Sequence, residues 1–121
     1  MAPIETITIT IGRLRTTLED IPGGIECVVC GKPTVKAFVP YQFEGDVVVR
    51  VLQTPGYRCT SPTCAEDPPE YVSHEALLEI FTVARDEMLE RGLTLEAEKF
   101  KRRIEFQKRA QEESRRLEGD N

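Results

Sequence analysis

Tryptophan is absent from this 121-residue chain, and its aromatic residues are three tyrosines and five phenylalanines. With so few large apolar side chains, the hydrophobic core must be small. Chains of this size often need a metal ion or a disulfide to stabilise the fold. The composition therefore directs attention to the four cysteines.

Histidine is nearly absent, since His74 is the only one. It follows Pro68 and Pro69 on a different element from the thiols, so a Cys–His nucleophile is not expected. The chain has no glycine-rich phosphate loop, and no spacing of Asp and Glu singles out an acid–base pair. The sequence does not predict an enzyme, and His74 is expected to be exposed in the first turn of a helix.

Long hydrophobic runs are also missing. No stretch of about eighteen apolar residues is present, so no membrane-spanning helix is expected. The first residues, MAPIETITIT, lack the basic stretch and apolar run of a secretory signal. We expect a cytoplasmic protein with no membrane partner, and in a reducing cytosol four cysteines in two pairs favour a metal over disulfides.

Charge is unevenly distributed along the chain. Residues 99–121 carry eight Lys/Arg and five Asp/Glu, whereas residues 1–98 carry eight and sixteen. This asymmetry is typical of a nucleic-acid-binding tail. The residues that would contact phosphates are Lys99, Lys101, Arg102, Arg103, Lys108 and Arg109. The interleaved Glu105, Glu112 and Glu113, and the lack of an interleaved aromatic platform, favour instead a solvated helix face of mixed charge.

Strands are predicted in the first half of the chain. Ile and Thr alternate over residues 6–11, which indicates a half-buried strand. Residues 34–43 and 47–52 are rich in β-branched residues and flank the turn-forming residues 44–46, so they predict a hairpin. The sequence TPGY, residues 54–57, is then expected to form a second turn.

Helices are predicted in the second half. Ser73 is expected to cap a helix that ends at Gly92, and Thr94 is expected to cap a second one. The apolar stripes of the two helices are Leu77, Phe81, Ala84 and Met88, and then Ala97, Phe100 and Ile104. Beyond Phe106 the stripe fades into a charged tail.

The four cysteines form two pairs on either side of the predicted hairpin. Cys27 and Cys30 lie in CVVCG, where Gly31 permits a positive φ after the second thiol. Cys59 and Cys64 lie in CTSPTC, a spacing at the upper limit for zinc-binding loops. Closure of the hairpin brings the pairs together, so we favour one structural Zn²⁺ held by all four thiolates.

Other assignments of the cysteines remain open at this stage. A disulfide or redox-active thiols, two unrelated thiol pairs, and an iron ion with four thiolate ligands are the alternatives. For zinc, we expect chelation to unfold the region around residues 25–72, because structural zinc contributes about 10–16 kcal/mol in small fingers. The chain then divides into an N-terminal strand and linker (1–24), a zinc-binding β module (25–72) and a C-terminal helical segment with a charged tail (73–121). The predicted class is α+β, with a small zinc-ribbon-like β-hairpin module followed by two α-helices.

The cysteine pattern and the hairpin resemble the YgiT-type zinc finger family. The segments that carry the resemblance are CVVCGK, YQFEG with Tyr41 and Gly45, and VVVRVLQTPGYRCTSPTCAED. The resemblance implies a zinc-binding module with Cys27, Cys30, Cys59 and Cys64 as ligands. In antitoxins with this finger, the module contacts an mRNA-cleaving toxin and a separate C-terminal helix-turn-helix binds operator DNA.

The chain departs from that family pattern in three places, the first of which is a strand-bearing extension that precedes the finger. The second cysteine pair is Cys-x4-Cys, and the C-terminal pattern continues as one charged helix with no recognition helix. The sequence therefore predicts a zinc-stabilised protein-interaction module, the antitoxin component of a toxin–antitoxin pair, whose partner is a small toxin or a second copy. The alternative is a nucleic-acid-binding zinc-ribbon protein that uses the basic C-terminal helix.

Overall fold

The computed structural model describes residues 6–43 and 47–119. A four-stranded mixed sheet is built around the long strand β3 (Val47–Arg58). Strand β2 (Val35–Phe43) pairs antiparallel with one side of β3. On the other side, β1 (Ile7–Ile11) pairs parallel with the first half of β3, and β4 (Glu70–Val72) pairs antiparallel with its last residues. Two helices follow, so the predicted α+β class, with a hairpin module before two helices, is confirmed.

The alternation of Ile and Thr is realised in β1. Ile9 and Ile11 are each 5% exposed and face the helices, whereas Thr8 and Thr10 are exposed. The register places Ile9 opposite Val49 on β3. The predicted N-terminal segment therefore contributes a strand to the same sheet as the predicted β module.

The turn predicted at Thr54–Tyr57 is wrong, because β3 continues through these residues to Arg58. The N–H of Ser73 donates to the carbonyl of Pro55 (3.2 Å), so the backbone of Pro55 faces away from β2. It lies between the segments that pair with β1 and β4, where a missing N–H costs no ladder hydrogen bond. A Cβ on Gly56 would lie 2.0 Å from the carbonyl oxygen of Tyr71, so this glycine allows the close approach of β4.

The predicted turn of the hairpin, residues 44–46 with Gly45, lies outside the described residues. The two strands it joins are paired as predicted, from Val35 opposite Arg58 to Phe43 opposite Val49. The register shifts between Val39 and Tyr41, at Pro40 on the edge strand. Edge strands and irregularities of this kind are where sheets tolerate proline.

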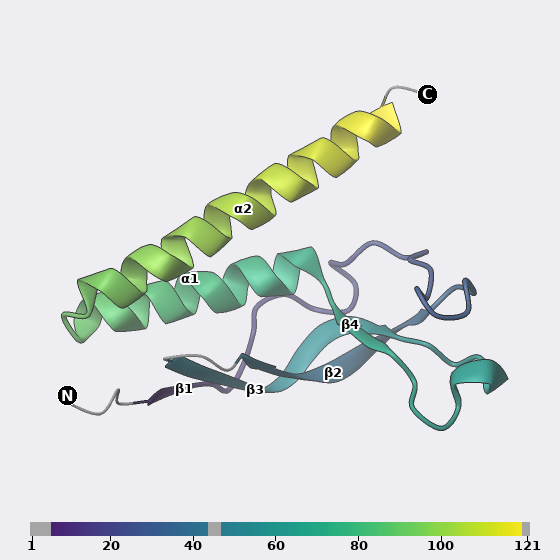
Figure 1. The fold of residues 1–121 in the computed structure, drawn as a ribbon, viewed down its shortest axis with the longest axis horizontal. Coiled ribbons are helices and arrows are strands. Elements are labelled where there is room, and N and C mark those ends of the chain that lie inside the picture. Colours follow the sequence, from purple (N-terminus) through teal and green to yellow (C-terminus); the bar gives the residue numbers. More distant parts are fainter. Residues whose placement is uncertain (1–5, 44–46, 120–121) are drawn as a thin grey trace.

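Two helices cover one face of the sheet (Figure 1). Helix α1 (His74–Glu90) is capped by Ser73, whose Oγ accepts from the N–H of Ala76 (3.1 Å). Gly92, at φ 75°, follows the end of α1. Helix α2 (Thr94–Gly119) begins at Thr94 itself and continues through the charged tail. Neither helix in the described part of the chain has the length and apolar character needed to cross a membrane.

The main core lies between the sheet and the helices. Phe100 of α2, which is 1% exposed, reaches both α1 and β2: its ring centroid lies 6.3 Å from that of Phe81 and 6.2 Å from that of Phe43. The buried members of this cluster are Ile9, Ile11, Val47, Val49, Val51, Ile80, Phe81, Ala84, Met88, Ala97, Phe100 and Ile104. The predicted helix stripes therefore pack within the chain.

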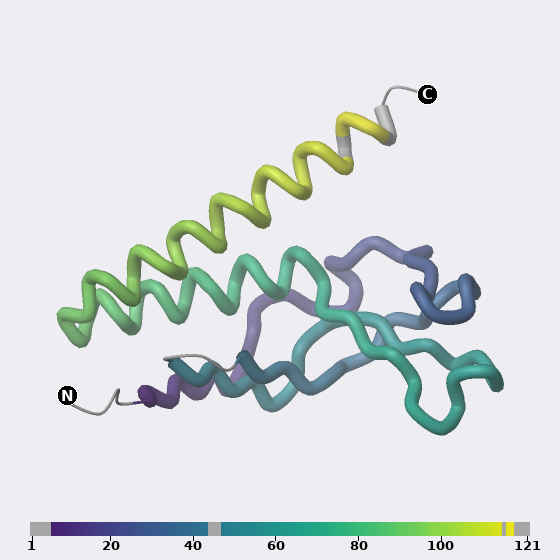
Figure 2. Tube along the Cα trace, viewed as in Figure 1, coloured from purple at the N-terminus to yellow at the C-terminus, as the bar shows by residue number. Residues whose placement is uncertain are grey.

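The segment between β1 and β2 links the sheet to α1 and to the first cysteine pair (Figure 2). Glu79 of α1 accepts hydrogen bonds from the backbone N–H groups of Arg15 and Thr16 at 2.7 to 3.4 Å. Farther along, the hydroxyl of Tyr57 donates to the carbonyl of Pro22. These contacts hold the segment against the sheet–helix layer before it reaches Cys27.

Candidate metal centre

The first cysteine pair lies on a tight loop that the backbone closes. The N–H of Gly31 donates to the carbonyl of Cys27 (2.8 Å), and the N–H of Cys27 donates to the carbonyl of Lys32 (2.9 Å). Gly31 has φ 73°, in the left-handed region predicted for it. The turn aims both thiols of the CVVC sequence in one direction and leaves Val28 and Val29 outside, 84% and 68% exposed.

The second pair is closed by a short 3-10 helix. Cys59 follows the last residue of β3, and its N–H donates to the carbonyl of Pro69 (3.1 Å). Ser61 caps the helical turn Pro62–Cys64, accepting from the N–H of Thr63 (3.3 Å). The N–H of Cys64 donates to the carbonyl of Ser61 (3.0 Å), so the four intervening residues fold back and return the second thiol to the first.

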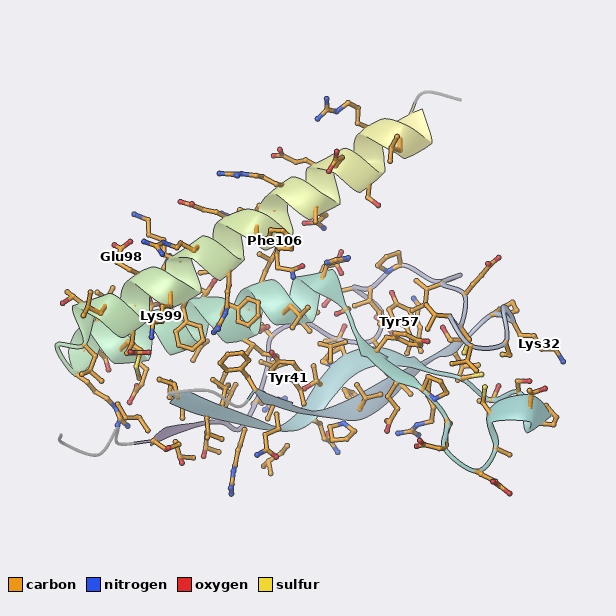
Figure 3. The ribbon with its side chains drawn as sticks, viewed as in Figure 1. Lys32, Tyr41, Tyr57, Glu98, Lys99 and Phe106 are labelled. Atoms are coloured by element: carbon orange, nitrogen blue, oxygen red, sulfur yellow. The ribbon has the colours of Figure 1, made fainter. Side chains whose placement is uncertain are left out.

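The four thiols meet at the end of the sheet farthest from β1. Their Sγ atoms all lie within 4.8 Å of one another, and Figure 3 shows the sulfur atoms gathered near Lys32. Cys27 and Cys59 are each 2% exposed, and Cys64 is 6% exposed. In a tetrahedral site with Zn–S bonds of about 2.3 Å, the sulfurs are about 3.8 Å apart. The cluster therefore has dimensions that suit one metal ion with four thiolate ligands.

This geometry bears on the alternatives left open by the sequence. The two pairs are not unrelated, because they form one cluster. All four cysteines are free thiols, and the Sγ atoms of Cys30 and Cys59 are 3.5 Å apart, against about 2.05 Å in a disulfide. Zinc and iron both accept four thiolates, and the geometry does not separate them.

The thiols of the cluster have unequal acidities. The backbone N–H of Cys30 is the main cause that lowers the pKa of Cys27 to about 6, and the backbone N–H of Lys32 lowers the pKa of Cys30. Burial, together with the thiols around it, raises the pKa of Cys64 to about 12. The backbone N–H of Ser61 lowers the pKa of Cys59, but burial and the thiols of Cys30 and Cys27 outweigh it and raise that pKa.

Tyr71 of β4 is a contact of the cluster that the sequence reasoning missed. Its hydroxyl donates to Sγ of Cys27 (3.7 Å) and accepts from the N–H of Val28 (3.1 Å). Tyr71 therefore connects the first cysteine loop to β4 and to the start of α1. A three-residue strand has too little periodicity to be found from sequence, and Tyr71 lies 44 residues from Cys27.

His74 is not part of the cluster. It is exposed at the start of α1, as predicted, and its Nδ1 lies 2.7 Å from Oε1 of Gln107 on α2. The four thiols are the residues that could hold a metal ion at this site.

The six basic residues of α2 are not gathered into one patch. Lys99 pairs with Glu96 (3.2 Å), and the guanidinium of Arg103 stacks on the ring of Phe43, 3.9 Å from its centroid. The other four, Lys101, Arg102, Lys108 and Arg109, are exposed. At about 100° per residue these four spread over the solvent side of the helix, where Glu98, Glu105 and Glu112 lie among them. The surface is one of mixed charge.

Comparison of the chain with protein-family models, curated proteins and solved structures found no match. The resemblance to YgiT-type zinc fingers therefore stays a prediction that depends on the cysteine frame and the hairpin. The observed site is a cluster of three buried thiols and one half-buried thiol that joins two loops at one end of an α+β fold.

Proposed function

We propose that Cys27, Cys30, Cys59 and Cys64 hold one structural Zn²⁺. The observation that carries the proposal is the convergence of four buried or half-buried thiols within 4.8 Å. Four protein ligands complete a tetrahedral site and leave no position for water or substrate, which is typical of structural rather than catalytic zinc. The unequal pKa values of the four thiols also support the proposal. Four adjacent thiolates would accumulate negative charge, and a divalent cation offsets that charge.

Metal analysis of the purified full-length chain tests this proposal. We expect one equivalent of zinc per chain and no visible absorption band. Cys64→Ser should reduce the bound zinc to well below one equivalent, whereas Thr63→Ser in the same loop should retain it. Stoichiometric iron with a thiolate charge-transfer band would contradict zinc, and a native disulfide found by mass spectrometry would contradict any four-thiolate metal.

The role of this centre is to present a surface for a protein partner. The metal fixes a loop whose tip exposes Val28 and Val29, two adjacent β-branched apolar side chains. Exposed apolar side chains on a rigid loop suit protein contact, and no ligand remains free for chemistry. We therefore propose a zinc-stabilised protein-interaction module that functions in the cytoplasm, where thiols stay reduced.

Within that proposal, the most specific candidate is an antitoxin of the YgiT-type family. The cysteine frame and the paired hairpin strands support it, while helix α2 runs unbroken over Thr94–Gly119, so operator binding through a helix-turn-helix is not proposed. A pull-down from the native cell with zinc retained, followed by mass spectrometry, tests the idea. A small ribonuclease-like protein that the full chain neutralises on co-expression would support it. Recovery of a toxin that Val28→Asp and Val29→Asp still bind normally would contradict the role of the loop tip.

A further inference from the structure

Helix α2 carries a second set of exposed apolar side chains on its solvent side. Leu95, Phe106 and Leu117 are 79%, 68% and 70% exposed. They are eleven residues apart, which at about 100° per residue is three turns plus about 20°. The three side chains therefore lie on one line about 33 Å long. Figure 1 shows the C-terminal part of α2 extending away from the sheet, and Figure 3 labels Phe106 on this helix.

The line of apolar side chains is symmetric about its centre. Leu95 precedes Phe106 by as many residues as Leu117 follows it. A two-fold axis at Phe106 therefore places Leu95 of one copy against Leu117 of a second antiparallel copy, and Phe106 against Phe106. Closed homodimers use self-complementary surfaces of this kind, in which the same patch contributes from both chains.

Two charges beside the line, Lys99 and Glu113, follow the same symmetry. Lys99 lies seven residues before Phe106 and Glu113 seven after, each about 20° from the direction of Phe106. The two-fold axis sets Lys99 opposite Glu113 of the second copy, twice in the dimer. Arg103, close to the axis, is stacked on Phe43 within its own chain, so its charge is directed away from the seam.

A hollow beside Phe106 offers room for an aromatic ring. It has a volume of about 470 Å³ and is lined by Phe81, Arg102, Arg103, Phe106 and Gln107. The guanidinium plane of Arg102 and the ring of Phe81 are surfaces on which an aromatic side chain packs well. In the antiparallel arrangement the side chain nearest this hollow is Phe106 of the second copy.

We propose that two copies of this chain associate antiparallel along α2, with Phe106 at the two-fold axis. The inference deepens the proposed function, on which it rests, because it names one partner of the interaction module as a second copy. The dimer seam uses α2 side chains and the hollow that Phe81 of α1 helps to line, and the cysteine loops stay free for another protein.

Analytical ultracentrifugation of the zinc-loaded full chain over a concentration series tests the dimer. We expect Phe106→Glu to raise the dimer dissociation constant at least about 100-fold, since central aromatic anchors dominate such interfaces. Leu52→Glu, at a site 75% exposed on the sheet, is the matched control and should change it by less than about twofold. A chain that is monomeric up to about 0.5 mM, or equal weakening by both variants, would overturn the proposal.

Charge reversal and cross-linking test the arrangement. Lys99→Glu and Glu113→Lys should each weaken the dimer about tenfold, and the double variant should restore it. Phe106→Cys should cross-link to itself in zinc-loaded protein, and Leu95→Cys should cross-link only when mixed with Leu117→Cys. Cross-linking of Leu95→Cys to itself, or no rescue by the double reversal, would refute the antiparallel seam. Zinc content measured in the same samples keeps the two proposals separate, because a monomer with bound zinc contradicts the dimer alone.

Discussion

Removal of the metal should unfold the two cysteine loops and leave the sheet and helices folded. In residues 25–34 and 59–69, the buried apolar side chains are the thiols themselves, Cys27, Cys59 and Cys64. The main core consists of twelve buried residues, none of them in these loops. The loops therefore have almost no hydrophobic stabilisation, so their order would depend on the proposed metal, whereas the main core does not contact that site.

The expected loss of amide protection in the loops can be worked out from the stabilities of the thiol cluster and the main core. Structural zinc contributes about 10–16 kcal/mol of apparent binding free energy, and a domain of this size is stable by about 5–15 kcal/mol. The hydrogen-exchange protection of the loop amides cannot exceed the value set by the free energy of global unfolding, so global stability limits the change that can be measured. We expect loop amides to lose at least about 1,000-fold of protection, which is about 4 kcal/mol of opening free energy. Core amides of β3 and α1 should change by less than about tenfold.

Hydrogen exchange with mass spectrometry on the full chain, with and without a chelator, measures this difference. Metal content must be determined on the same samples, and Cys64→Ser should reproduce the chelator pattern in untreated protein. Unchanged loop protection after proven metal removal would refute the reasoning. Simultaneous loss of protection in α1 and the loops would also refute it, and would restore the wider unfolding of residues 25–72 predicted from the sequence.

Three further predictions test the site and its supports. Zinc affinity should rise as the pH increases above about 6, because Cys27 is ionised above about 6, whereas the raised pKa values of Cys59 and Cys64 keep these two thiols protonated before binding, so that binding releases their protons. Calorimetry in buffers of different ionisation enthalpy measures this proton release, and a pH-independent affinity contradicts the prediction. Gly56→Ala should destabilise the fold by at least about 3 kcal/mol in denaturant titrations, because the added Cβ would meet the carbonyl oxygen of Tyr71. Gly12→Ala is the control: its added Cβ would have no atom within 4 Å, so stability should change by less than about 0.5 kcal/mol. Glu79→Gln should lower the free energy of unfolding by about 1–3 kcal/mol and should reduce the hydrogen-exchange protection of the amides of Arg15 and Thr16. Glu90→Gln, on the exposed side of α1, is the control and should leave these two amides protected.

The features that sequence predicts correctly are local. Alternation over residues 7–11, the Ser73 cap and the apolar stripes of the helices depend on residues within a turn or a strand of each other. The joining of the two cysteine pairs is a long-range contact, but the hairpin between them makes it predictable, since closing the hairpin brings its two ends together. The spacing of the cysteines and the periodicity of the apolar residues are enough to predict the fold class and the convergence of the four thiols.

The features that sequence misses depend on pairings over long separations. β1 pairs with β3 across 40 residues, from Ile7 to Val47, and no local pattern specifies a parallel partner. Pro55 and Gly56 resemble a turn, yet they continue β3, and β4 pairs beside Gly56 so closely that a Cβ there would meet the carbonyl oxygen of Tyr71. Turn chemistry alone does not distinguish a glycine needed for its φ from one needed for space.

Strand β3 connects two parts of the molecule that are held together differently, the main hydrophobic core and the thiol cluster. Near its start Val47, Val49 and Val51 face the main core, and the residue after its end, Cys59, belongs to the thiol cluster. Between them the carbonyl of Pro55 accepts from the N–H of Ser73, the residue that caps α1. A shift of the cysteine loops is therefore transmitted first to Tyr71 and β4, and then to the cap of α1. Because Val47, Val49 and Val51 are fixed by burial in the main core, such a shift should stop at the first turn of α1.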